Sequence, residues 1–91
     1  MKGEFEVGGH ALNQFRARFS DPAATWRDVS LILEGCRVTK REWVGGELFV
    51  YAVLEDACFV LKRLRPGRYR VITSIRLEGM DKFYAGVENV A

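Results

Sequence analysis

The sequence predicts an α+β domain in which two N-terminal helices pack on one face of a four-stranded antiparallel β-meander. Apolar residues recur at helical spacing before Gly35, alternate with polar residues after it, and the alternating segments are joined by very short links. Strands joined by such links must be antiparallel, because parallel neighbours need a crossover of about a dozen residues or more. Helices followed by a meander are typical of an α+β architecture.

Composition points to one small globular domain. The 91 residues are 48% hydrophobic and 29% charged. We expect a single domain over residues 1–91, with a core within 9–78, a tail at 79–91, and a monomeric or homodimeric state. No apolar run approaches the roughly 20 residues needed to span a bilayer, and the N-terminus lacks the apolar stretch of a secretory signal. The expected location is therefore cytoplasmic, without membrane contact.

The first helix is predicted over about residues 10–19, after an extended lead-in at residues 1–8. Its apolar residues gather on one side at helical spacing: Ala11, Leu12, Phe15 and Phe19. On the neighbouring edge, His10, Gln14 and Arg18 recur at i, i+4 and i+8. The helix is therefore expected to combine a core face with a polar edge.

The second helix has two candidate starts. Asp21 can serve as N-cap with Pro22 in the first turn, or Thr25 can begin the helix with Asp28 completing a box-like cap. The helix is expected to end near Glu34, before a left-handed Gly35. Its apolar stripe of Trp26, Val29, Ile32 and Leu33 indicates a structural role.

Four strand segments follow: Cys36–Val44, Glu47–Leu54, Ala57–Leu64 and Arg68–Glu78. Strict alternation in the last segment directs Tyr69, Val71, Thr73, Ile75 and Leu77 towards the helices. It leaves Arg68, Arg70, Ile72, Ser74 and Arg76 on an open face. Met80, Phe83, Tyr84 and Val87 then predict a short C-terminal helix that would complete the core, cover the open face or dock on a partner.

Basic residues are unevenly distributed, although the formal net charge is only +2. Residues 57–77 contain six basic and no acidic residues: Lys62, Arg63, Arg65, Arg68, Arg70 and Arg76. A one-sided cationic surface is the footprint of a phosphate-bearing partner such as RNA, but a solvated strand face has the same composition. Both interpretations stay open on the sequence alone.

The only histidine, His10, opens the first helix, where imidazole can exchange a proton near neutral pH. A lone histidine at this position is also often a cap or a surface residue. Cys36 and Cys58 lie in apolar, strand-like sequence and are expected to be reduced core residues. One histidine and two cysteines at no ligand spacing predict neither a metal site nor a cofactor.

The helix His10-Ala-x-x-x-Phe-x-x-Arg-Phe19, a second helix, a meander and the final strand Arg70-Val-Ile-Thr-Ser-Ile75 together resemble one group of small domains. They resemble the toxin-like, RelE-like branch of the barnase/EndoU/colicin/RelE-type superfamily of metal-independent ribonucleases, over roughly residues 9–78. The resemblance implies an endoribonuclease acting on RNA, within a toxin–antitoxin pair or a bacterial or phage conflict. An antitoxin or a regulated target is the implied protein partner.

The resemblance also implies catalytic residues. His10 matches the motif histidine, Arg18 the second basic position of the helix, and Thr73 the hydroxyl of the last strand. Alternation instead places Ser74 on the polar face, and a β-bulge would reconcile the two hydroxyls.

The phosphate-binding set implied for RNA comprises Gln14, Arg16, Arg68, Arg70 and Arg76. Gln14 stands where the family often has arginine, so one cation is missing unless Arg16 or Arg70 replaces it. A non-enzymatic regulator of the same fold, binding RNA or a protein, is therefore the alternative, and a purely structural or interaction protein is the third interpretation.

Metal-independent cleavage needs a base for the ribose 2′-OH and donors for the phosphate oxygens. The requirement for a 2′-OH makes RNA the substrate. With a single histidine, a second proton-transfer role would fall to water or to Glu47, Tyr51 or Tyr69.

Overall fold

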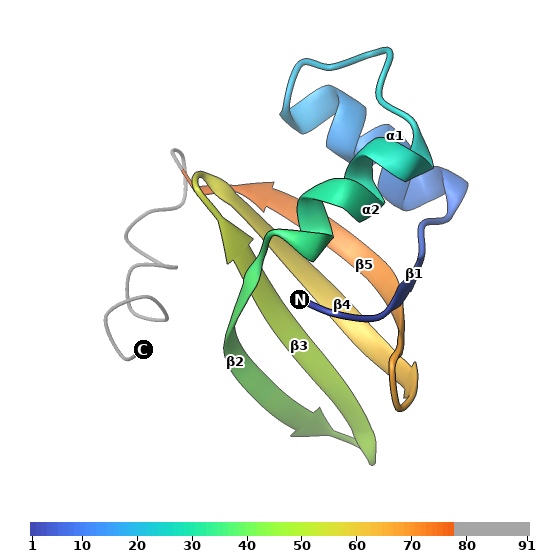
Figure 1. The fold of residues 1–91 in the computed structure, drawn as a ribbon, viewed down its shortest axis with the longest axis vertical. Coiled ribbons are helices and arrows are strands. Elements are labelled where there is room, and N and C mark those ends of the chain that lie inside the picture. Colours follow the sequence, from blue (N-terminus) through green and yellow to red (C-terminus); the bar gives the residue numbers. More distant parts are fainter. Residues whose placement is uncertain (78–91) are drawn as a thin grey trace.

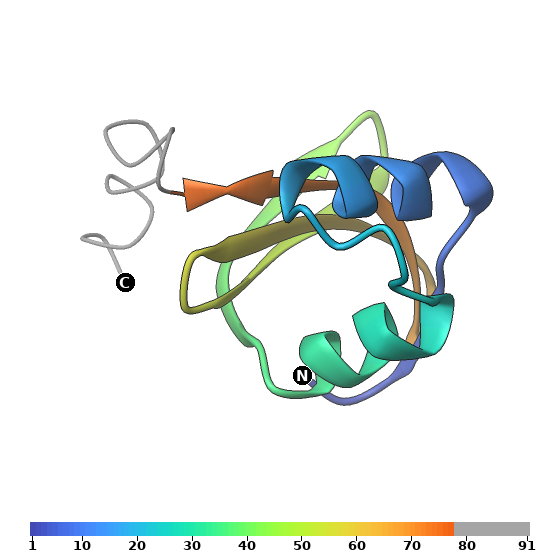
Figure 2. The ribbon, with the colours of Figure 1, turned by 90° about the horizontal axis from the view of Figure 1, so that it is seen from above.

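The computed structural model describes residues 1–77, which form two helices and a five-stranded mixed sheet (Figure 1). In chain order the elements are β1 (Glu4–Glu6), α1 (Gly9–Arg18), α2 (Trp26–Glu34), β2 (Arg37–Val44), β3 (Glu47–Leu54), β4 (Ala57–Arg65) and β5 (Arg68–Arg76). The strand order is β1-β5-β4-β3-β2. From above, the sheet is strongly curved, α2 faces its concave side and α1 lies along β5 (Figure 2).

The predicted meander is confirmed for β2 to β5, because each neighbouring pair is antiparallel. The prediction of four strands is wrong, since the expected lead-in contributes a fifth. β1 pairs in parallel with β5, placing Glu4 opposite Arg68 and Glu6 opposite Arg70. Because β1 contains only three residues, alternation within it is too short to identify its partner strand.

The residues that cap α2 determine where this helix begins and ends. Thr25 and Asp28 form a capping box: Thr25 Oγ1 accepts from the Asp28 amide and Asp28 Oδ2 accepts from the Thr25 amide. The later of the two predicted starts is therefore confirmed, and the start at Asp21 is wrong. Gly35 closes α2 in a right-handed conformation, not the left-handed one expected.

The core lies between the two helices and the facing side of the sheet, here called the helix face. Its buried members include Ala11 and Phe15 of α1, Val29 and Leu33 of α2, and Ala52, Phe59, Leu61 and Val71 of the sheet. Trp26 departs from the predicted apolar stripe of α2, because its side chain is exposed. Trp26 is the first residue of the helix.

A register shift in β5 corrects the predicted division of its faces. Val60 pairs with Thr73 and Leu61 with Val71, so Ile72 is an extra residue that forms a β-bulge. After the bulge, Ser74 lies opposite the core residue Phe59 on the helix face and is buried, whereas Thr73 and Ile75 lie on the other side, here called the outer face. The expected open face with Ser74 is therefore wrong.

Cys36 and Cys58 are buried, and no disulfide joins them. Burial raises the pKa of the Cys36 thiol to about 11, and its Sγ donates to the Ile32 carbonyl. Neither helix within residues 1–77 has the length and apolarity required to cross a bilayer. The predicted C-terminal helix lies outside the described residues.

Candidate functional site

Four of the residues singled out in the sequence are joined by hydrogen bonds where α1 meets β5. Arg18 Nη1 donates to Thr73 Oγ1 at 2.8 Å, and Thr73 Oγ1 donates to Gln14 Oε1 at 2.9 Å. Gln14 Nε2 then lies 3.0 Å from His10 Nε2. We call Arg18, Thr73, Gln14 and His10 the linked set.

The bonds of the linked set have a direction. A guanidinium can only donate, so the Thr73 hydroxyl accepts from Arg18 and its own proton is directed to Gln14. That proton assigns Gln14 Oε1 to the Thr73 side, which leaves the amide NH₂ facing His10. An amide NH₂ can only donate, so a hydrogen bond at this contact requires His10 Nε2 to be the acceptor.

Two features of the fold bring the linked set together. β1 pairs only with residues 68–70 of β5, so the later half of β5 is an edge that α1 covers (Figure 1). The bulge at Ile72 turns Thr73 away from the core, so its hydroxyl is available at this edge. The i, i+4 spacing along α1 then aligns His10, Gln14 and Arg18 beside it.

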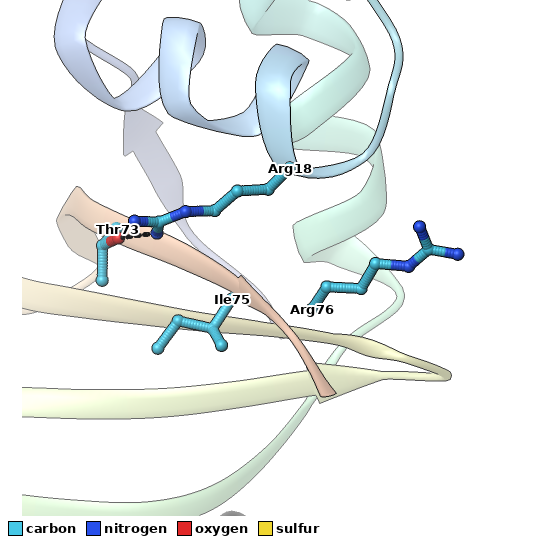
Figure 3. A pocket seen from close by; sticks show the side chains of 4 residues that line it. All are labelled: Arg18, Thr73, Ile75 and Arg76. Carbon is cyan, nitrogen blue, oxygen red and sulfur yellow. Dashed lines mark hydrogen bonds between the residues drawn. The ribbon is translucent and has the colours of Figure 1, made fainter. Parts of the chain in front are cut away.

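A hollow of about 550 Å³ adjoins the linked set and is lined by Arg18, Thr73, Ile75 and Arg76. In Figure 3 the Arg18 guanidinium crosses from α1 to Thr73, with Ile75 and Arg76 on the same strand beyond it. Arg18 also donates to the Ser74 carbonyl, so two acceptors on β5 hold its head group. Arg76 Nε bonds to Asp56 at 3.2 Å.

The arginines at the start of β5 are neutralised, which the charge distribution in the sequence did not predict. Arg68 Nη1 lies 2.7 Å from Glu4 Oε2, and Arg70 Nε lies 2.9 Å from Glu6 Oε1. Both acids come from β1, which pairs with this part of β5. The matching two-residue spacing of Glu4-x-Glu6 and Arg68-x-Arg70 is the signal that could have revealed the pairing.

Two further predicted site residues do not join the linked set. Arg16 Nε donates to the Ala24 carbonyl at 2.8 Å, so this side chain braces the link between the helices. Ser74 is 1% exposed, and its hydroxyl has no hydrogen-bond partner among residues 1–77. The hydroxyl that faces α1 is therefore that of Thr73.

The three candidates for a second proton-transfer role contact residues outside the linked set. Glu47 forms an ion pair with Lys62, the Lys40 ammonium lies over the ring of Tyr51, and Tyr69 stacks on Phe5. Within residues 1–77 no three His, Cys, Asp or Glu side chains gather as metal ligands.

Searches against protein-family models, curated proteins and solved structures found no match for this chain.

Proposed function

We propose that the protein is a RelE-like, metal-independent endoribonuclease that uses the ribose 2′-OH of RNA as its nucleophile. One observation carries the proposal: a single hydrogen-bonded chain joins the only imidazole to an exposed arginine, beside a hollow at the edge of β5. Imidazole is the side chain suited to proton transfer near neutral pH, and arginine is suited to phosphate oxygens.

In the proposed reaction, His10 takes the proton of the 2′-OH as this oxygen attacks the adjacent phosphorus. The bond from phosphorus to the 5′-oxygen breaks, the 5′-oxygen takes a proton from water, and a 2′,3′-cyclic phosphate remains. The hydroxide left by that water takes the proton from His10, which regenerates the base. A general base of this kind contributes about 10²–10⁴-fold to the rate.

The Gln14 side-chain amide has both a donor and an acceptor, so it can pair with His10 before and after the proton moves. When His10 gains a proton on Nε2, the Gln14 amide can turn so that Oε1 accepts from it. Thr73 then accepts from both Gln14 and Arg18 with its two lone pairs. His10 Nε2 has one lone pair, so Gln14 must release this nitrogen before the 2′-OH can donate its proton to it.

Arg18 has the complementary role of stabilising charge on the non-bridging phosphate oxygens. Thr73 and the Ser74 carbonyl hold its Nη1, and its other N–H donors have no partner within residues 1–77 and can face a phosphate at the hollow. Donors fixed before the reaction stabilise developing charge without reorganising, which is worth about 10²–10³-fold per donor.

The direct test uses a DNA strand with a single ribonucleotide, incubated with the purified protein in excess chelator. We expect one cut, on the 3′ side of the ribose, with a 2′,3′-cyclic phosphate identified by mass spectrometry. His10→Ala should lower the rate by about 10²-fold or more with affinity unchanged within a few-fold. Arg41→Gln, an exposed change on β2, is the matched control and should cleave normally.

A cellular test addresses the toxin role that the resemblance implies. Expression of the wild-type chain in bacteria should arrest growth, and His10→Ala should relieve the arrest at equal protein level. Growth arrest that persists in His10→Ala would contradict a catalytic cause.

A second candidate is a non-enzymatic regulator that binds RNA or a protein partner. Two observations favour it: Glu4 and Glu6 neutralise Arg68 and Arg70, and the Gln14 amide occupies Nε2 of His10. If the wild-type protein cuts neither free nor ribosome-bound RNA, this candidate replaces the ribonuclease.

A further inference from the structure

Two tight turns lie together at the end of the sheet opposite α1 (Figure 1): Gly45-Gly46 between β2 and β3, and Pro66-Gly67 between β4 and β5. A hollow of about 540 Å³ opens between them. The residues of its lining used here are Trp43, Leu48, Lys62, Arg63 and Arg65, which we call the tryptophan end.

Trp43 presents an indole ring to solvent from a fixed position. Its side chain is 65% exposed, although its backbone pairs with that of Leu48 inside the sheet. The Arg63 guanidinium lies over this ring, 5.8 Å from its centroid, in a cation–π contact. An aromatic ring held by sheet pairing and left open to solvent offers a flat apolar surface at little entropic cost.

The arginines near Trp43 lack the carboxylate partners that Arg68 and Arg70 have within residues 1–77. Lys62 is paired with Glu47 at 3.3 Å. Neither Arg63 nor Arg65 has a carboxylate within ion-pair distance in residues 1–77. Two arginines near one exposed ring therefore carry unbalanced positive charge.

We propose that the tryptophan end binds an unpaired segment of nucleic acid, with a base stacked on Trp43 and the adjoining phosphates bound by Arg63 and Arg65. Single strands present π-faces and phosphates in alternation, and proteins bind them with an aromatic ring flanked by cations. An acidic peptide would satisfy the arginines but would leave the indole without a planar partner.

This inference takes from the proposed function only that the ligand is a nucleic acid. It needs no 2′-OH, because stacking and phosphate contacts are the same for DNA and RNA. Single-stranded DNA, which cannot be cleaved through a 2′-OH, is therefore a suitable probe for binding at this end alone.

The chain contains a matched control for Trp43. Trp26, at the start of α2, is 52% exposed and has the Arg27 guanidinium 5.2 Å from its ring centroid. The capping carboxylate of Asp28 lies within the same helical turn, so the local charge is balanced. If any exposed tryptophan beside an arginine bound nucleic acid, Trp26 and Trp43 would contribute equally to the binding affinity.

The experiment measures the anisotropy of a fluorescein-labelled short oligothymidylate titrated with the full chain. Trp43→Ala should weaken binding by at least about fivefold, whereas Trp43→Phe should keep most of the affinity and Trp26→Ala all of it. The double variant Arg63→Gln/Arg65→Gln should flatten the slope of log affinity against log salt by about 1.4, at about 0.7 per phosphate lost.

Equal losses in Trp43→Ala and Trp26→Ala, or no loss in Trp43→Ala, would overturn the proposal. Competition by poly-glutamate with the same dependence on Trp43 would also overturn it, in favour of a protein partner. RNA cleavage without oligothymidylate binding would remove this inference and leave the proposed ribonuclease, while binding without cleavage would do the reverse. Circular dichroism of each variant verifies that the fold is intact.

Discussion

The two ends of the sheet use arginine in opposite ways. At the α1–β5 edge, Arg18 is fixed by Thr73 and by the Ser74 carbonyl, and its bonds continue through Gln14 to His10. At the tryptophan end, neither Arg63 nor Arg65 has a carboxylate partner within residues 1–77, and both line the hollow beside the exposed Trp43 ring. Fixed donors suit chemistry at defined atoms, whereas unpaired cations suit binding of a flexible polyanion.

The start of β5 provides a third case, which explains why charge counts mislead. Arg68 and Arg70 have the composition of a phosphate-binding strand, yet Glu4 and Glu6 are their partners. The function open to an arginine is therefore decided by what faces it across the sheet.

The largest expected effect concerns the α1–β5 edge. Arg18→Gln should lower RNA cleavage by about 10²–10³-fold, because it removes a charged donor fixed at the hollow. Arg41→Gln makes the same charge change at an exposed position on β2 and should leave cleavage unchanged. Equal losses in both variants would mean that only the total charge matters.

Thr73→Val should have an intermediate effect, because it cuts the linked set while keeping the shape of the side chain. Arg18 keeps its bond to the Ser74 carbonyl, but Gln14 loses the donor that fixes its amide. We expect kcat to fall about tenfold with KM nearly unchanged, as for loss of an interaction that orients the base. Steady-state kinetics that instead show a raised KM and an unchanged kcat would assign Thr73 to substrate binding.

Glu4→Gln combined with Glu6→Gln tests the neutralised arginines. Both changes leave Arg68 and Arg70 without a charged partner, so single-stranded RNA should bind several-fold more tightly. The log–log salt slope should steepen by about 1.4 if both arginines then reach phosphates. An unchanged slope would show that β5 offers no path for a strand even when its charge is exposed.

The smallest effects concern the buried thiols. Burial raises the pKa of Cys36 to about 11, above the value of about 8.5 for an exposed thiol. The stability that Cys36 contributes is therefore fully present below about pH 8.5 and is lost as pH rises through about 11. Urea unfolding at several pH values, compared with Cys36→Ala, measures this loss, and a pH-independent difference between the two proteins would contradict it.

The same burial makes the thiols useful for the comparison of the two ends. Folded wild-type protein should react slowly with a maleimide near pH 7.5, because Cys36 and Cys58 are both buried. Arg65→Cys should be labelled quickly and provides a probe of the tryptophan end. Rapid labelling of the wild type would rule out this use.

Local patterns predicted the elements that depend on neighbours in sequence. Short links and alternation predicted the meander from β2 to β5, and Thr25 with Asp28 predicted one cap of α2. β1 was not predicted as a strand, because its partners on β5 lie 64 positions away. The position of the bulge was not predicted from the alternation, because Ile72 is apolar and fits either face of the strand.

The candidate site was accessible from sequence only in part. Helical spacing predicted that His10, Gln14 and Arg18 share one edge, and the Gln14 contact with His10 lies along that edge. The choice of Thr73 over Ser74 depends on the bulge, which alternation cannot supply. The tryptophan end was missed because Trp43 and Arg63 come from different strands, and their contact depends on sheet register.

The parallel pairing of β1 with β5 also has a consequence for the order of folding. The meander from β2 to β5 forms from neighbours joined by short links, whereas β1 must close a loop across 64 positions. β1 contains only three residues, so few hydrogen bonds reward that closure. We therefore expect the ion pairs of Glu4 and Glu6 with Arg68 and Arg70 to form late in folding and to be lost when β1 opens locally.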